Sequence, residues 1–138
     1  MTPQEIIAHL DLAPHPEGGH YRQTWVAENA GRPTGTCIYF LLQAGERSHW
    51  HAVDAVEIWL YHAGAPLVLS LAETTDGPAK DHLLTPDLTK GAPQLIVPHG
   101  HWQSARSTGA YTLVSCTVSP GFTFDGFTLA PPELEIPR

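Results

Sequence analysis

The stretch GERSHWHAVDAVEIWLYHAG, residues 45–64, decides the fold of this chain. Successive residues of a β-strand point to opposite faces, so His49, His51 and Val53 are predicted to share one face of a first strand. The short segment DAV then reverses the chain, and Glu57 begins a returning strand with its side chain on the inner face. A hairpin of this shape directs His51 and Glu57 into one cavity, where an imidazole and a carboxylate can exchange protons with a ligand.

The rest of the chain consists of one helix followed by short predicted strands. The opening MTPQEIIAHL places Glu5 three residues after Thr2, which is the capping-box pattern of a helix start. Many short strands separated by Gly, Pro, Asp and Asn favour an all-β jelly roll, which protects its edge strands. We predict a single domain over 1–138, with the helix in 1–12, the barrel in 13–130 and an irregular tail in 131–138. The predicted strands are His20–Val26, Thr36–Leu42, Ser48–Val53, Glu57–Ala63, Leu67–Ala72, Gln94–Val97, Trp102–Ala105 and Tyr111–Val118, with a short one at His82–Thr85.

Composition excludes several classes of partner. The net charge of −7 disfavours nucleic acid and anionic membranes, because both attract cationic surfaces. No apolar run approaches the ~18 residues of a membrane helix, and no leader pattern opens the chain, so a cytoplasmic protein is expected. Cys37 and Cys116 lie far apart in apolar runs, which is typical of small buried hydrophobic side chains.

Several motifs along the chain carry a family resemblance. Gly45, His51, Glu57 and Gly64 match the spacing of the first cupin motif, with Val53 in place of its second histidine. Pro98, Gly100 and Gln103 resemble the second cupin motif, with Gln103 in the position of its histidine. Together with HPEGGHYRQTW at 15–25, VPHGHWQSA and VSPGFTFDGFTLA, they make the chain similar to a family of small single-domain cupins of unknown function.

The resemblance implies a double-stranded β-helix that is usually a homodimer, with a pocket for a small molecule. Members of the family are compared structurally with sugar-nucleotide epimerases and with ligand-binding cupins. By that analogy, the ligand is polar and sugar-like, and its identity stays open.

The resemblance also raises the question of a metal. A metal-binding cupin offers three histidines and one glutamate, whereas this chain offers His51, Glu57 and Gln103, with Val53 as a gap that His49 or water would have to fill. Such a set is weak beside three imidazoles. We therefore expect no tightly bound cofactor, and a weakly bound divalent metal at His51, Glu57 and Gln103 remains the alternative.

Without a metal, the same residues predict acid–base chemistry. His51 is then the base that removes a proton next to a carbonyl, Glu57 adjusts its pKa, and a tyrosine acts as the acid. Three functions stay open: an isomerase-type enzyme without a tightly bound metal, a metal-dependent oxygenase or isomerase with an incomplete ligand set, and a non-catalytic binding or sensor module in which His51 and Glu57 only position a ligand. The candidate tyrosines are Tyr39, Tyr61 and Tyr111, and the ligand-binding candidates are Gln103, His49, Trp59, Tyr39, Arg47 and Arg22, the two arginines as anchors for an anionic group.

Three other segments have open roles. Residues 73–93 form either a surface excursion or a lid. The loop at 15–19 is expected to start the first strand, with Glu17 and Arg22 at the pocket mouth. The phenylalanine-rich segment at 120–130 is expected to close one end of the barrel.

Overall fold

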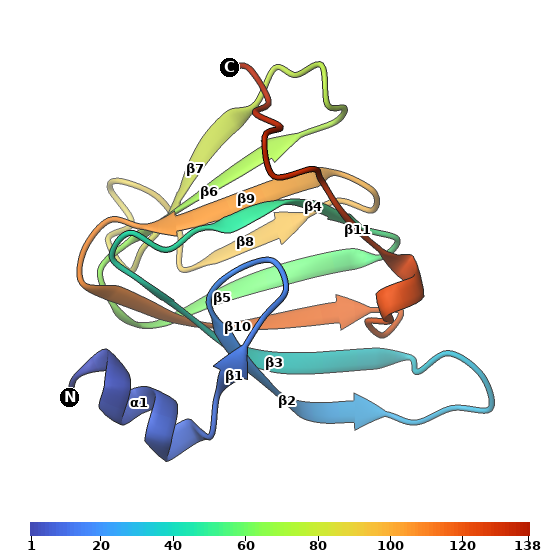
Figure 1. Cartoon of the computed structure of the whole chain (residues 1–138), viewed down its shortest axis with the longest axis horizontal. Helices are drawn as coiled ribbons and strands as arrows, with labels where there is room; N and C mark the ends of the chain where they lie inside the picture. Colours follow the sequence, from blue (N-terminus) through green and yellow to red (C-terminus); the bar gives the residue numbers. More distant parts are fainter.

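Two antiparallel β-sheets face each other in the computed structural model, which describes all residues 1–138 (Figure 1). The order of strands is β1-β2-β3-β10-β5-β8 in the first sheet, here called sheet A, and β11-β4-β9-β6-β7 in the second, sheet B. This is the predicted all-β jelly roll. The strands are β1 (Ala13–Pro14), β2 (His20–Ala27), β3 (Gly35–Gln43), β4 (Ser48–Val53), β5 (Val56–Gly64), β6 (Leu67–Ala72), β7 (Lys80–Leu84), β8 (Gln94–Val97), β9 (Trp102–Ser107), β10 (Tyr111–Ser119) and β11 (Phe127–Leu129).

The single α-helix, α1 (Pro3–Leu10), lies outside sheet A (Figure 1). Its capping box is confirmed: Glu5 N–H donates to Thr2 Oγ1, and Thr2 N–H donates to the Glu5 carboxylate. Ile6 of the helix packs with Leu12 and with Leu41 on the outer face of β3. No helix in the structure combines the length and the apolar character that a membrane crossing needs.

The main apolar core fills only part of the space between the sheets. On β3, Phe40 and Leu42 point into this core, whereas Thr36 and Ile38 on the same face line a cavity. On β5, Trp59 belongs to the core, although Glu57 two residues earlier lines the cavity. The inward-facing side chains of β3 and β5 therefore fill the core at one end of each strand and line the cavity at the other end.

All nine predicted strands are present, with ends that agree to within two residues. Two very short strands, β1 and β11, escaped prediction because two or three residues are too few to show an alternating pattern. Residues 73–93 contain β7, which pairs with β6 at the edge of sheet B, and none of them lines the cavity. This segment therefore extends a sheet and is not a lid over the cavity.

The tail beyond Pro131 has no regular secondary structure, yet it is packed. Ile136 is buried against Trp50 and Ala72 on the outer side of sheet B. The tail thus covers the back of β4, the strand that carries His51.

Candidate functional site

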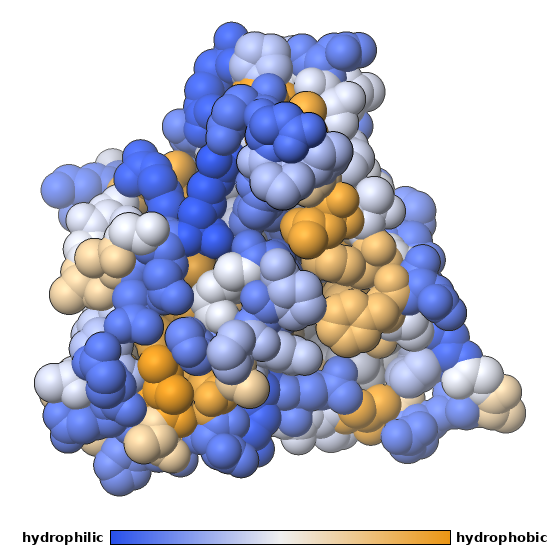
Figure 2. Space-filling model, viewed as in Figure 1, coloured by the Kyte–Doolittle hydropathy of each residue, from blue (hydrophilic) through white to orange (hydrophobic).

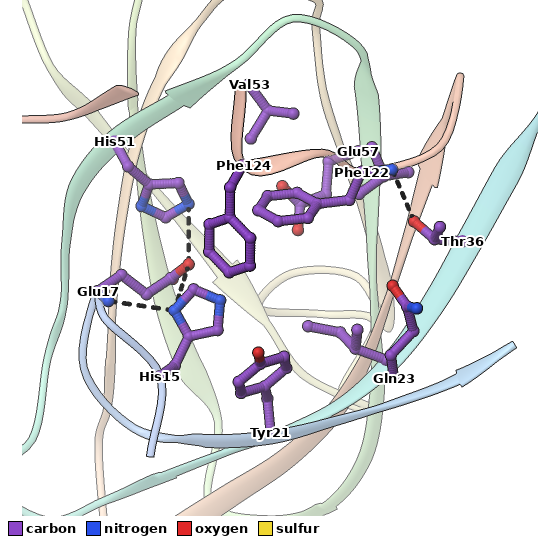
Figure 3. Close-up of a pocket in the computed structure, with 12 residues that line it drawn as sticks. His15, Glu17, Tyr21, Gln23, Thr36, His51, Val53, Glu57, Phe122 and Phe124 are labelled. Carbon is purple, nitrogen blue, oxygen red and sulfur yellow. Dashed lines mark hydrogen bonds and ion pairs between the residues drawn. The ribbon is translucent and has the colours of Figure 1, made fainter. Parts of the chain in front are cut away.

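A cavity of about 180 Å³ opens between the two sheets. Figure 3 shows His51, Glu17 and His15 on one side of it, Tyr21 and Gln23 on another, and Phe122 and Phe124 across its middle. The twelve lining residues are His15, Glu17, Tyr21, Gln23, Thr36, Ile38, His51, Val53, Glu57, Val118, Phe122 and Phe124.

His51 is buried, with 2% of its surface exposed, and its two ring nitrogens have different surroundings. Nδ1 lies 2.7 Å from the carbonyl oxygen of His49, which can only accept, so Nδ1 carries the proton. Nε2 therefore presents its lone pair, and it faces Glu17 Oε1 at 3.6 Å. Burial lowers the pKa of His51, although the nearby Glu57 opposes this effect, so the ring is neutral near pH 7.

Glu17 reaches the cavity from the loop before β2. The Glu17 carbonyl accepts from His49 N–H at 2.8 Å, which ties this loop to β4. Burial raises the pKa of the Glu17 carboxyl to about 8, against the opposing effect of a hydrogen bond from the Ser48 hydroxyl. Glu17 is therefore largely protonated near pH 7, and its carboxyl faces the unprotonated nitrogen of His51.

His15, on the other side of Glu17, is also uncharged. Glu17 N–H donates to His15 Nδ1 at 3.1 Å, so this nitrogen has no proton, and it lies 3.4 Å from Glu17 Oε1. Burial lowers the pKa of His15 to about 4, so its ring is neutral as well. Two neutral imidazoles and a protonated carboxyl thus stand side by side without a formal charge.

Glu57 enters the cavity from β5 in the opposite sheet. Gln103 Nε2 donates to Glu57 Oε1 at 2.8 Å, and Gln103 Oε1 accepts from Trp59 Nε1 at 2.9 Å. The indole N–H can only donate, so it fixes which end of the amide faces the carboxyl. Burial raises the pKa of Glu57 to about 7, with the nearby His51 lowering it.

The structure brings together three of the residues that the sequence pointed to, in different roles. His51 and Glu57 line the cavity, and Gln103, opposite His51 on β9, holds Glu57 from behind. Trp59 is 1% exposed and belongs to the core, so it supports Gln103 and does not form a pocket wall.

His49 does not follow the expected alternation. A β-bulge between Ser48 and His51 breaks the pairing of β4 with β9. His49 Nε2 instead lies 2.9 Å from the Pro131 carbonyl oxygen, in contact with the tail. The expectation that His49 and His51 share the cavity face is therefore corrected.

Tyr39, Arg22 and Arg47 lie outside the cavity as well. Tyr39 packs beside α1 on the outer face of sheet A, because its parity on β3 is opposite to that of Ile38. Arg22 donates to the Leu10 carbonyl at the end of the helix. Arg47 donates to Ser104 Oγ and to both carboxylate oxygens of Glu135 on the outer side of sheet B. Neither arginine is placed to anchor an anionic ligand in the cavity.

The donor set expected for a metal does not fit the geometry. Gln103 would have to offer its amide oxygen, but that oxygen already accepts from Trp59. Val53 lines the cavity where a second histidine would stand, and the chain has no group of three or more His, Cys, Asp or Glu side chains arranged to hold a metal ion. Glu57 is instead hydrogen-bonded to Gln103 behind it, and His51 to the His49 carbonyl, so the three side chains do not form the expected ligand set.

Several lining residues were not singled out from the sequence. His15 lies directly before the Pro-x-Gly-Gly turn, and Tyr21 and Gln23 lie on β2, which follows it. Phe122 is held by a hydrogen bond from its N–H to Thr36 Oγ1 at 2.9 Å. The HPEGG loop carried a signal, because it concentrates ionisable residues beside two glycines. Glu17 was expected at the pocket mouth, and it lies beside His51.

Comparison with known proteins agrees with this architecture. The model of the family described as "Cupin superfamily (DUF985)" matches residues 4–130. Protein SO0799 from Shewanella oneidensis is 37% identical, with a TM-score of 0.88 over 94% of this chain and 85% of that one. A hypothetical protein from Leishmania major is 29% identical, with a TM-score of 0.86 over 97% and 90% of the two chains.

More distant structures share the fold alone. An oxalate decarboxylase from Bacillus subtilis is 12% identical, with a TM-score of 0.65 over 85% of this chain and 29% of that one. No curated protein matches the chain. The family match covers nearly the whole sequence, and the chain therefore belongs to the cupin superfamily, in the family of unknown function DUF985.

Proposed function

We propose that this cupin is an isomerase-type enzyme that moves a proton within a small polar ligand, without a tightly bound metal. The observation that carries the proposal is the facing pair of His51 Nε2 and the Glu17 carboxyl, 3.6 Å apart at the cavity wall. One of the two groups lacks a proton near pH 7 and the other holds one. A base and an acid with such matched protonation states are what proton transfer through an enol requires.

The proposed step balances within the ligand and the two side chains. His51 Nε2 removes a proton from a carbon next to a carbonyl, and the Glu17 carboxyl gives its proton to the carbonyl oxygen. The product is an enol, with His51 protonated and Glu17 ionised. Reversal of the two transfers at the neighbouring carbon, with His51 giving its proton to that carbon and Glu17 taking the proton of the other hydroxyl group, gives the isomer and restores both groups.

The size of the cavity limits the ligand. Its volume of about 180 Å³ lies below the roughly 300–1,000 Å³ that is typical of pockets for drug-sized molecules. A compact hydroxy- or amino-carbonyl compound fits this volume better than a sugar nucleotide does. The homodimer implied by the family resemblance remains a proposal too.

Hydrogen–deuterium exchange into a panel of small carbonyl compounds tests the proposal. The protein would be incubated in D2O with dihydroxyacetone, glyceraldehyde or glucosamine, and the loss of C–H signals followed by proton NMR. We expect exchange with the parent protein and a drop of about 100-fold or more in His51→Gln. His99→Gln is the matched control, because His99 is an exposed turn residue outside the cavity.

Two outcomes would contradict this function. Equal exchange in His51→Gln and the parent removes His51 as the base. A compound that saturates the cavity of the parent but never exchanges a proton supports the alternative, a non-catalytic binding module.

A further inference from the structure

The two carboxyl groups of the cavity have no cationic partner. Glu17 is bonded by the Ser48 hydroxyl and lies beside the neutral rings of His15 and His51. Glu57 is bonded by the uncharged amide of Gln103. None of the seven Lys and Arg residues of the chain lines the cavity.

Three carboxylates outside the cavity, by contrast, each have an arginine partner. Arg32 forms two hydrogen bonds to the Asp54 carboxylate, at 3.0 and 2.7 Å. Arg47 does the same with Glu135. Asp81 has Arg138 at 2.8 Å. Arg32, Arg47 and Arg138 therefore pair with acids near the surface. The two buried acids, for which a cationic partner would matter most, have none, because no Lys or Arg lines the cavity and burial penalises a lone carboxylate.

Aromatic rings complete the cavity. Phe122 and Phe124 lie edge to face, with ring centroids 5.0 Å apart, and Phe127 joins them at 5.7 and 6.0 Å. Phe124 is 55% exposed, and a patch of apolar surface covers the region of η1 (Phe124–Gly126) and β11 in Figure 2. Tyr21 supplies a fourth ring, as Figure 3 shows. The faces of such rings attract cations that are weakly hydrated.

We propose that the ligand of this cavity carries one cationic nitrogen, an ammonium or alkylammonium group, held between the carboxylates of Glu17 and Glu57 and the rings of Tyr21, Phe122 and Phe124. The proposal rests on the proposed function and names its substrate class: a small amine, such as an amino-carbonyl compound. The positive charge that pairs with the buried acids thus comes from the ligand, because no Lys or Arg side chain lines the cavity. An anionic ligand would instead meet two acids and no cation.

The charge balance of the cavity accommodates one such group. The ionisable groups that face Glu17 and Glu57 are His15, His51 and the thiol of Cys116, all uncharged in the empty cavity. A cationic nitrogen therefore finds no competing positive charge. One carboxyl ionises against it, and the other can keep its proton for transfer.

Matched pairs of probes isolate the effect of charge from that of shape. Choline and 3,3-dimethylbutan-1-ol have the same outline, and so do ethanolamine and propan-1-ol, but only the first of each pair is charged. Binding would be measured by calorimetry on the parent protein. We expect at least one cation to bind roughly tenfold more tightly than its neutral partner, from cation–π attraction and the paired carboxylate.

Substitution of the acids completes the test. Glu17→Gln and Glu57→Gln each keep the side-chain shape and remove one acid of the cavity. The variant that loses the carboxyl ionised against the cation is expected to lose most of the preference. Glu28→Gln is the control, since it makes the same glutamate-to-glutamine substitution at an exposed residue outside the cavity. The melting curve of each variant would verify that it is folded.

The proposal is overturned if neither cation binds better than its neutral partner, or if Glu28→Gln removes the preference as fully as the cavity variants do. One-to-one binding of Zn²⁺ that displaces choline would also overturn it, because the site would then be for a metal. These outcomes are separate from those of the exchange experiment: cation binding without deuterium exchange removes the enzyme and keeps the amine site, and exchange of neutral sugars without cation preference does the reverse.

Discussion

Two hollows of similar size lie on opposite sides of sheet B, and they differ in charge. The cavity between the sheets measures about 180 Å³ and holds two acids and no Lys or Arg. The hollow on the outer side of sheet B measures about 200 Å³ and is lined by Arg47, Arg106 and Arg138, with Glu135 and two serines. There, Arg47 is paired with Glu135, and Arg138 with Asp81 at its edge.

The difference shows where the chain accepts a cost in stability. Exposed ion pairs are cheap to form and contribute little, so the outer hollow is an ordinary surface feature that also fastens the tail. Buried acids without a cation are expensive to keep ionised. We infer that these acids beside His51 take part in ligand chemistry, and three substitutions test the difference between the two hollows.

The largest effect is expected from the support behind the cavity. Gln103→Leu removes the acceptor of Trp59 N–H and the donor to Glu57 in one step, inside a fully buried region. Unmet buried polar groups cost about 1–3 kcal/mol each, so we expect a loss of roughly 3 kcal/mol in the free energy of unfolding. Urea denaturation checks this, with Gln94→Leu on the exposed face of β8 as the control. Equal losses in the two variants would show that the Trp59–Gln103–Glu57 chain does not support the cavity.

A smaller effect is expected from pH. The raised pKa values of Glu17 and Glu57, about 8 and 7, mean that the folded state keeps protons that the unfolded state releases near pH 4.5, so these acids lower stability as pH rises. The lowered pKa values of His15 and His51 act in the opposite direction, but only below about pH 6.5, where unfolded histidine is protonated. Between pH 6.5 and 8 only the acids act.

We therefore expect the free energy of unfolding to fall by up to about 2 kcal/mol from pH 6.5 to pH 8, and Glu17→Gln to remove most of that fall. Urea midpoints at the two pH values measure it. A stability that is flat over this range in the parent, or one that falls equally in Glu17→Gln, would contradict the buried, unpaired state of the acid.

The smallest effect is expected in the outer hollow. Glu135→Gln removes the exposed ion pair with Arg47, in which the Glu135 side chain is 63% exposed. Such pairs are worth about 0–1 kcal/mol, and salt screens them. The free energy of unfolding should change by less than about 1 kcal/mol, and the change should shrink in ~0.5 M NaCl. A loss as large as that of Gln103→Leu would mean that Arg47 and Glu135 hold the tail against β4 as a structural clamp.

Local patterns predicted the framework well. The alternation in β5 and the capping box of α1 depend on neighbouring residues, and both appear in the structure. The same alternation correctly separates Trp50, behind β4, from His51 in the cavity. It fails at His49, because a bulge is set by the pairing with β9 and leaves no mark in the sequence of β4 itself.

The site was less predictable than the barrel. Glu57 and Gln103 follow from parity and motif spacing, but Glu17 comes from a loop whose path depends on a tertiary contact with β4. Tyr39 and Arg47 were predicted to bind the ligand because of their residue types, and this prediction was wrong. Tyr39 packs beside α1 and Arg47 pairs with Glu135 of the tail, and neither contact can be predicted from the local sequence.

The backbone conformation of Gly18, the residue after Glu17, restricts which residues relatives of this chain can carry at this position. Gly18 has a φ of 111°, and a Cβ on it would collide with the carbonyl oxygen of Arg47. A relative with any other residue at this point must route its loop differently, and it would then lose the acid beside the imidazole. Within the family, glycine at 18 and glutamate at 17 should therefore be conserved or lost together. The identity of these two adjacent residues would then distinguish relatives that keep the proposed proton-transfer pair from relatives that keep only the barrel.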